Sequence, residues 1–193
     1  MLGETLRSPR TGRQILYSPE VDIAVGPFAV LCSYEEEYDR LAEVHTELLA
    51  AMRRAFQMNL RDFGSSFTAP RLSSLCSYNL NARCFMALEI EKGNTDVKYL
   101  MGSMMNAATL GRMGVVVAWE WPRINDLLRA RESLAMWGVA GKNTLNTQNL
   151  LFLTRDQLLR ILSRRAVLIE SPPWPFNPHA KASTPNRRSL KRR

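Results

Sequence analysis

The sequence predicts an α/β fold with mixed α and β elements, in which a central mixed β-sheet is flanked by helices. An apolar run over residues 84–91 is followed by a helical pattern over 96–110 and a β-branched run over 113–119. This is the order of two parallel strands joined by a right-handed crossover. Helical periodicity before and after this unit supplies the covering layers.

The length of 193 residues is enough for one domain with a buried core, which we place at residues 1–170. No apolar run approaches the roughly 20 residues of a transmembrane helix. The first residues also lack the apolar core of a signal peptide. We therefore expect a cytoplasmic protein with no membrane partner.

The three cysteines, Cys32, Cys76 and Cys84, cannot all pair with one another. None lies in a CxxC motif or near a pair of histidines, which argues against a zinc site. Buried free thiols are the favoured interpretation.

The net charge of +8 is concentrated at the C-terminal end. Residues 171–193 are Pro-rich and then basic, with no acid after Glu170, and removing their six cations leaves the body at only +2. We expect a flexible tail that either binds nucleic acid loosely or is simply solvated. Arg187 and Arg188 are its candidates for nucleic-acid contact.

The N-terminal segment contains the first predicted strand. Residues 1–14 are polar and predict a flexible or loop-like start. Residues 21–25 then alternate β-branched with other side chains, which predicts a strand. Asp22 lies inside this strand and needs a partner, because burial of an unpaired carboxylate is costly.

A long amphipathic helix is predicted from Ser33 to about Leu60, with Ser33 and Glu36 as a capping box at its start. Residues 61–79 interrupt this pattern with Gly, Ser and Pro. They predict a loop with a strand at about 72–78, which would form a hairpin with the apolar strand that follows.

The C-terminal part of the domain continues the alternation of helix and strand. The pattern predicts a helix over residues 122–137, a short strand over 150–153 and a last helix that ends near Arg164. Thr154 and Gln157 have the spacing of a second capping box at the start of that helix.

Two acids at alternate positions, Glu89 and Glu91, lie in the apolar run and are followed by Lys92. Side chains two residues apart share one face of a strand, so the two carboxylates should point the same way. Carboxylates in a buried strand are costly unless they are paired, protonated or bound to a cation. A hard divalent ion such as Mg²⁺ prefers such oxygen ligands.

This arrangement resembles the PD-(D/E)xK nuclease superfamily, the fold of type II restriction endonucleases, resolvases and several repair nucleases. Pro19-Glu-Val-Asp22 is similar to the first half of the motif, and Leu88-Glu-Ile-Glu-Lys92 is similar to the second. The resemblance covers residues 15–30 and 84–119, under a third of the chain. It implies a restriction-endonuclease-like core.

The resemblance implies that Asp22 and Glu89 hold one or two Mg²⁺ or Mn²⁺ ions beside a scissile phosphate. Glu91 would complete the metal shell or act as general base. The family pattern places a lysine where this chain has Glu91. Lys92, one residue later, or Lys98 on the next helix would then orient the water or stabilise charge.

Supporting residues follow from the same resemblance. Glu20 and Asp62 are alternatives for the first acid, and Asn106 on the small-residue helix is a candidate for reaching the site. Arg123 is a candidate for a contact with a nucleic-acid phosphate.

The resemblance implies a metal-dependent endonuclease that hydrolyses DNA phosphodiester bonds, such as a restriction or defence enzyme, with RNA open as a substrate. A homodimer or larger complex is expected, because cutting two strands takes two sites. One alternative is an inactive nuclease-like fold that binds nucleic acid or a partner protein in a larger assembly. Another is an α/β interaction module whose acids lie on the surface.

Overall fold

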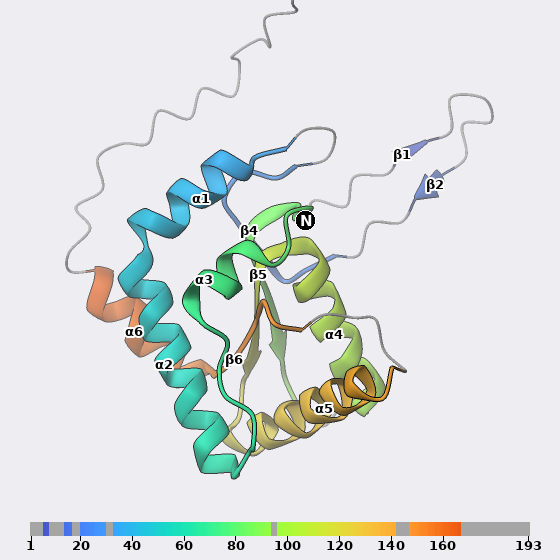
Figure 1. Ribbon diagram of the computed structural model, residues 1–193, viewed down its shortest axis with the longest axis vertical. Coiled ribbons are helices and arrows are strands. Elements are labelled where there is room, and N and C mark those ends of the chain that lie inside the picture. The colour runs from blue at the N-terminus through green and yellow to red at the C-terminus, as the bar shows by residue number, and fades with distance from the viewer. Residues whose placement is uncertain are drawn as a thin grey trace, which may run out of the picture.

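A four-stranded mixed sheet forms the centre of the computed structural model (Figure 1). Its strands, in order across the sheet, are β3 (Ile23–Val25), β4 (Cys84–Glu91), β5 (Gly111–Ala118) and β6 (Leu150–Thr154). β3 is antiparallel to β4, whereas β4, β5 and β6 are parallel. The predicted α/β fold, with a mixed sheet and flanking helices, is confirmed.

The structure describes a discontinuous set of segments, with residues 6–7, 14–16, 20–29, 33–93, 96–141 and 147–166. The predicted tail over 171–193, which includes Arg187 and Arg188, lies outside these segments.

The N-terminal segment contains a small sheet of its own. β1 (Leu6–Arg7) and β2 (Gln14–Leu16) pair in antiparallel fashion as a separate two-stranded sheet. The prediction of a loop-like start over residues 1–14 is therefore wrong where these strands pair.

Helices cover both faces of the central sheet. α4 (Val97–Leu110) packs on β4 and β5, and α5 (Trp121–Val139) packs on β5 and β6. α2 (Thr46–Phe63) packs on β6 and on α6 (Arg155–Ala166), and Figure 1 shows these two helices across the sheet from α4. No helix in the described segments is long and apolar enough to cross a membrane.

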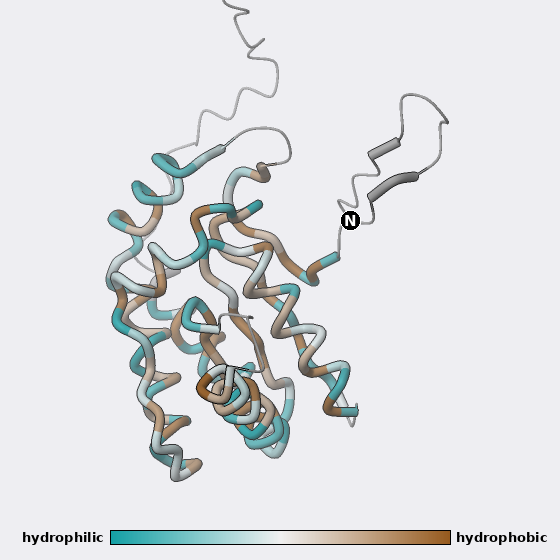
Figure 2. Tube along the Cα trace, turned by 45° about the vertical axis from the view of Figure 1, so that its right-hand side comes forward, coloured by the Kyte–Doolittle hydropathy of each residue, from teal (hydrophilic) through white to brown (hydrophobic). Residues whose placement is uncertain are grey.

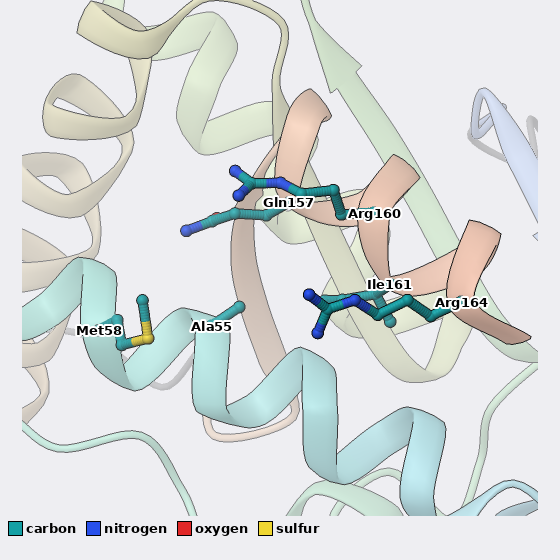
Figure 3. A pocket seen from close by; sticks show the side chains of 6 residues that line it. All are labelled: Ala55, Met58, Gln157, Arg160, Ile161 and Arg164. Atoms are coloured by element: carbon teal, nitrogen blue, oxygen red, sulfur yellow. The ribbon is translucent and has the colours of Figure 1, made fainter.

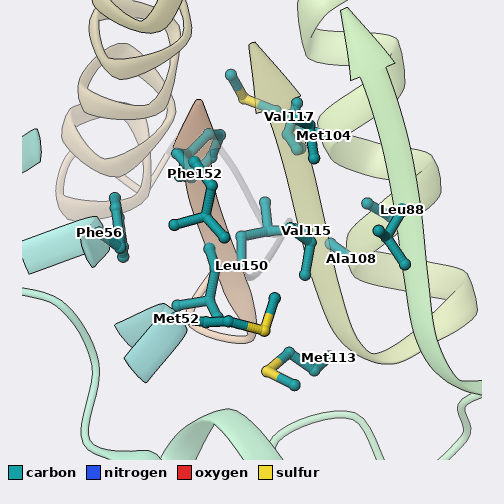
Figure 4. Close-up of a cluster of buried hydrophobic side chains, with 14 of the residues drawn as sticks. Met52, Phe56, Leu88, Met104, Ala108, Met113, Val115, Val117, Leu150 and Phe152 are labelled. Atoms are coloured by element: carbon teal, nitrogen blue, oxygen red, sulfur yellow. The ribbon is translucent and has the colours of Figure 1, made fainter. Parts of the chain in front are cut away.

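The core lies between β5, β6 and the covering helices. All eight residues of β5 are buried, as expected for a parallel strand that has helices on both sides. Figure 4 shows Leu150 and Phe152 of β6 beside Met52 and Phe56 of α2. The Phe56 and Phe152 ring centroids are 5.4 Å apart. In Figure 2 the outer helix α1 (Glu35–Val44) is largely hydrophilic, in contrast to the strands.

The predicted helix over residues 33–60 is two helices, α1 and α2, which meet at His45. The His45 backbone leaves the helical region, with φ −104° and ψ 18°. The Thr46 hydroxyl donates a hydrogen bond to the Ala42 carbonyl at 2.9 Å. Such a bond competes with helix geometry and favours a bend.

Only one of the two predicted capping boxes forms. The helix after Ser33 has Tyr34 at its N-cap and no side-chain cap hydrogen bond, so that prediction is wrong. At the start of α6, the Gln157 N–H donates to Thr154 Oγ1 at 3.3 Å, and the Thr154 N–H donates to Gln157 Oε1 at 2.9 Å. The second box is therefore confirmed.

The strand predicted near residues 72–78 is a helix, α3 (Leu72–Ser77). Leu72 and Leu75 are three residues apart, a helical spacing, and Leu75 is fully buried. The predicted hairpin is also wrong, because the antiparallel partner of β4 is β3.

The prediction of buried free thiols is confirmed for Cys84, whereas Cys76 is free but only half-buried. Cys76 and Cys84 are both free. Cys84 is fully buried, and this burial raises the pKa of its thiol to about 12. Cys32 lies outside the described segments.

Gly114 of β5 permits the close approach of α4 to the sheet. A Cβ at this position would lie 2.7 Å from the carbonyl carbon and 2.8 Å from the carbonyl oxygen of Ala107, and would also meet the Leu150 side chain. A side chain here would therefore push α4 away from β5.

We expect Gly114→Ala to lower the free energy of unfolding by about 1–3 kcal/mol, because overpacking displaces the helix. Urea unfolding measures this change. Gly102→Ala in α4 is the control, since a Cβ there meets nothing within 4 Å. It should be neutral or stabilising by up to about 1 kcal/mol. Equal stability of Gly114→Ala and wild type would contradict the close contact.

Candidate functional site

Asp22 and Glu89 face each other across the β3–β4 pair. Ile23 pairs with Leu88 in the antiparallel ladder, so Asp22, one residue before it, falls opposite Glu89. Opposed residues of antiparallel strands share one face of the sheet. Asp22 Oδ2 accepts a hydrogen bond from the Ile90 N–H at 2.7 Å, which holds its carboxylate beside β4.

Glu89 is a buried carboxyl group with one unsatisfied oxygen. The residue is 8% exposed, and its Oε1 has no hydrogen-bond partner among the described residues. Burial raises the pKa of Glu89 to about 7. A hydrogen bond from the Asn106 side chain opposes this shift, and the carboxylates of Asp22 and Glu91 add to it. Near neutral pH the group therefore lies between its neutral and charged forms.

Glu91 is also buried, but its carboxylate has partners from two helices. Ser103 of α4 donates a hydrogen bond to Oε1. Arg123, near the start of α5, places Nη2 3.8 Å from Oε2. Arg123 is only 6% exposed and also pairs with Asp126, at 3.3 Å. The guanidinium is therefore a buried counter-charge for the Glu91 carboxylate.

The two predicted lysines lie on aromatic rings. Lys92 Nζ is 5.0 Å from the ring centroid of Trp119, and Lys98 Nζ is 5.0 Å from that of Tyr99. Neither lysine forms an ion pair with a carboxylate in the described part of the chain. We call Asp22, Glu89 and Glu91 the acid cluster. The cation that contacts it, through Glu91, is instead Arg123.

Glu20 and Asp62, the alternative first acids, are not among the carboxylates that act on the pKa of Glu89, which are Asp22 and Glu91. Glu20 is exposed before β3, and Asp62 is exposed near the end of α2, which packs on β6 rather than β4. Asp22 is therefore the first acid that the fold brings to Glu89. Asn106, predicted as a supporting residue, does contact Glu89.

Two hollows lie at different places in the fold. One, of roughly 370 Å³, is bordered by Gly93, Glu120, Pro122, Arg123 and Asp126, and so adjoins the acid cluster through Arg123. The other, of roughly 220 Å³, lies between α2 and α6, where Figure 3 shows Arg160 and Arg164 along one side. Neither α2 nor α6 carries Asp22 or the two glutamates.

The cluster fits a site with two metal-binding carboxylates better than one with three. Within the described segments, no three His, Cys, Asp or Glu side chains are grouped so that they could hold a metal ion. Mg²⁺ is commonly bound by one or two carboxylates, with water and substrate phosphate oxygens completing its shell. Asp22 and Glu89, at opposed positions of neighbouring strands, could supply this smaller number of ligands.

Comparisons with protein-family models, with curated proteins and with solved structures found no match to this chain. The acid cluster is therefore interpreted from its own geometry and chemistry.

Two contacts of the cluster were not predicted from the sequence. The sequence predicts no role for Ser103, and it predicts Arg123 only as a candidate for a contact with a phosphate. A signal for Ser103 exists, because it lies three residues before Asn106 and thus on the same side of α4. The contact of Arg123 with Glu91 depends on the position of the start of α5 relative to β4. Hydrophobic periodicity in the sequence does not predict this position.

The raised pKa of Glu89 should make stability depend on pH. The folded state holds its proton more tightly than the unfolded state, in which the pKa is near 4.5, so stability should fall as pH rises from about 4.5 to about 7. The loss attributable to Glu89 is on the order of 3 kcal/mol at most. Urea unfolding at pH 5 and pH 8 measures it.

Glu89→Gln should remove this component and be more stable than wild type at pH 8. Glu36→Gln is the matched control, since Glu36 is exposed in the first turn of α1, and it should keep the pH dependence of wild type. A Glu89→Gln protein with the wild-type pH profile would contradict the burial of an ionisable group at this position.

Arg123→Met should lower the free energy of unfolding by about 3 kcal/mol, because it leaves the buried Glu91 carboxylate without its cation. Adding Glu91→Gln should restore part of the loss, which a double-mutant cycle measures. Arg129→Met is the control, since Arg129 is 70% exposed in its pair with Asp126. It should change stability by under about 1 kcal/mol.

Proposed function

We propose that this protein is a metal-dependent nuclease that hydrolyses phosphodiester bonds at the acid cluster of β3 and β4. The observation that carries the proposal is the buried Oε1 of Glu89, which lacks a hydrogen-bond partner on a carboxyl group that faces a second acid. A purely structural glutamate at such a position would be expected to have its oxygens satisfied. A divalent cation shared with Asp22 would satisfy this oxygen and favour the charged form of Glu89.

The proposed division of labour follows the contacts. Asp22 and Glu89 would hold Mg²⁺ or Mn²⁺, which would lower the pKa of a bound water and neutralise charge on the phosphate. Glu91, which Ser103 and Arg123 hold in place, would accept a proton from the attacking water. Asn106 orients the Glu89 carboxylate. A catalytic role for Lys92 or Lys98 stays a prediction.

The proposed substrate is DNA, with RNA as the alternative. In this proposal the protein is a restriction or defence enzyme that acts on DNA in the cytoplasm. Cleavage of both strands would require a homodimer or a larger complex that presents two sites.

One observation favours a second candidate function. Neither predicted lysine contacts the acids in the described residues, and the acids do not form a group of three. A nuclease-like fold that binds nucleic acid or a partner protein without cutting would have the same appearance. The two candidates differ in metal-dependent cleavage.

Incubation with supercoiled plasmid, single-stranded DNA and RNA should give cleavage with Mg²⁺ or Mn²⁺ and none with EDTA. Asp22→Asn and Glu89→Gln should each reduce the rate at least 100-fold, because each removes a ligand charge, whereas Glu36→Gln should match wild type. Gel electrophoresis measures the products.

Metal binding supplies a readout that does not depend on cleavage. At pH 8, Mn²⁺ should raise the Tm of wild type and leave that of Asp22→Asn or Glu89→Gln unchanged. A metal-induced rise without cleavage would favour the inactive alternative. If Mn²⁺ causes no rise in Tm and no cleavage is seen, the metal site is refuted.

A further inference from the structure

Lys92, Trp119 and Arg155 form a row along one edge of the sheet. The last rung of the parallel strands joins Glu91 to Ala118 and Ala118 to Thr154. The three residues of the row come directly after these strand ends, so they lie together at the carboxyl edge. In open α/β sheets this edge is the usual place for ligands.

The indole of Trp119 brings two cations together. Lys92 Nζ lies 5.0 Å from its ring centroid, and the Arg155 guanidinium carbon lies 4.9 Å from it. Trp119 is 38% exposed and Lys92 is exposed, so the row faces solvent. We name these three residues the cation row.

The cation row keeps capacity for a ligand. Arg155 Nε pairs with Asp156 at 3.0 Å, but that carboxylate is 65% exposed, and such a pair contributes little. Lys92 has no ion pair with a described carboxylate. Two solvated cations held on one indole can both neutralise phosphates of a nucleic-acid strand.

The row is linked to the acid cluster by a backbone hydrogen bond, and a second aromatic residue follows it in the sequence. The backbone N–H of Trp119 donates to the backbone carbonyl of Glu91 at 2.9 Å, which links the row to the strand that carries the acids. Trp121, two residues further on at the start of α5, is 57% exposed. An exposed indole two residues after the row offers a stacking surface for an unpaired base.

We propose that the carboxyl edge binds a single-stranded segment of nucleic acid, with phosphates on Lys92 and Arg155 and a base stacked on Trp121. This inference rests on the proposed function in that it names the form of the substrate that reaches the acids. A duplex fits less well, because its bases are already stacked and offer no free face to the indole. An acidic peptide would use the cations but not the indole.

The test measures binding in EDTA, so that no cleavage is required. Fluorescence anisotropy with a labelled oligothymidylate of about 12 nucleotides gives the affinity for a single strand. Trp121→Ala should weaken binding roughly 10-fold through lost stacking, and Trp121→Phe should restore most of it. Lys92→Ala with Arg155→Ala should make the slope of log K against log salt shallower by about 1.4.

Arg40→Ala with Arg54→Ala is the matched control, because it removes the same charge from exposed positions on α1 and α2. This control should keep the salt slope of wild type. Thermal melting of each variant checks that folding is intact. A hairpin duplex and polyglutamate complete the set of ligands.

Several outcomes would overturn the proposal. A control slope as shallow as that of the double variant would show diffuse charge rather than a row. An unchanged affinity of Trp121→Ala, or binding of duplex or polyglutamate as tight as that of the oligonucleotide, would remove the single-strand assignment. If the edge binds DNA but the plasmid stays intact, the proposed hydrolysis fails and this inference stands. If cleavage survives and binding at the edge is absent, the reverse holds.

Discussion

The burial of Glu89 and Glu91 in β4 is the constraint on which the site depends. A carboxylate removed from water needs a compensating charge or hydrogen bond. Glu91 obtains both from Ser103 and Arg123, on the two helices that follow β4 and β5. Glu89 obtains only part of this compensation, because its Oε1 has no hydrogen-bond partner among the described residues.

The middle of the fold could be predicted because its signals are local. The alternation of strand, helix and strand from β4 to β5 follows from apolar runs and helical spacing, and the Thr154–Gln157 box marks the start of α6. The break at His45 was missed because the apolar stripe continues across it. The strand proposed at α3 was wrong because a short Ser-rich run is ambiguous, and only the burial of Leu75 decides for a helix.

The acid cluster was predictable only in part, because the sequence pattern gives local placement along a strand but not contacts between distant elements. Alternation places Glu89 and Glu91 on one face, and the strand pattern around Asp22 makes it a candidate. The contact of Arg123 with Glu91 joins residues on elements whose relative position depends on the packing of whole helices. The expected lysine contact did not appear, because Lys92 lies over Trp119 at the edge.

The two acids of the site lie on elements of unequal strength. Glu89 belongs to a strand bonded on both sides, whereas Asp22 precedes a three-residue edge strand whose side chains are all exposed. Edge elements of this kind open by local fluctuation at a lower free energy than the core. The pairing of the two acids can therefore be lost and regained while the rest of the sheet stays folded. Any ligand bound by both acids would stabilise the attachment of β3 to β4.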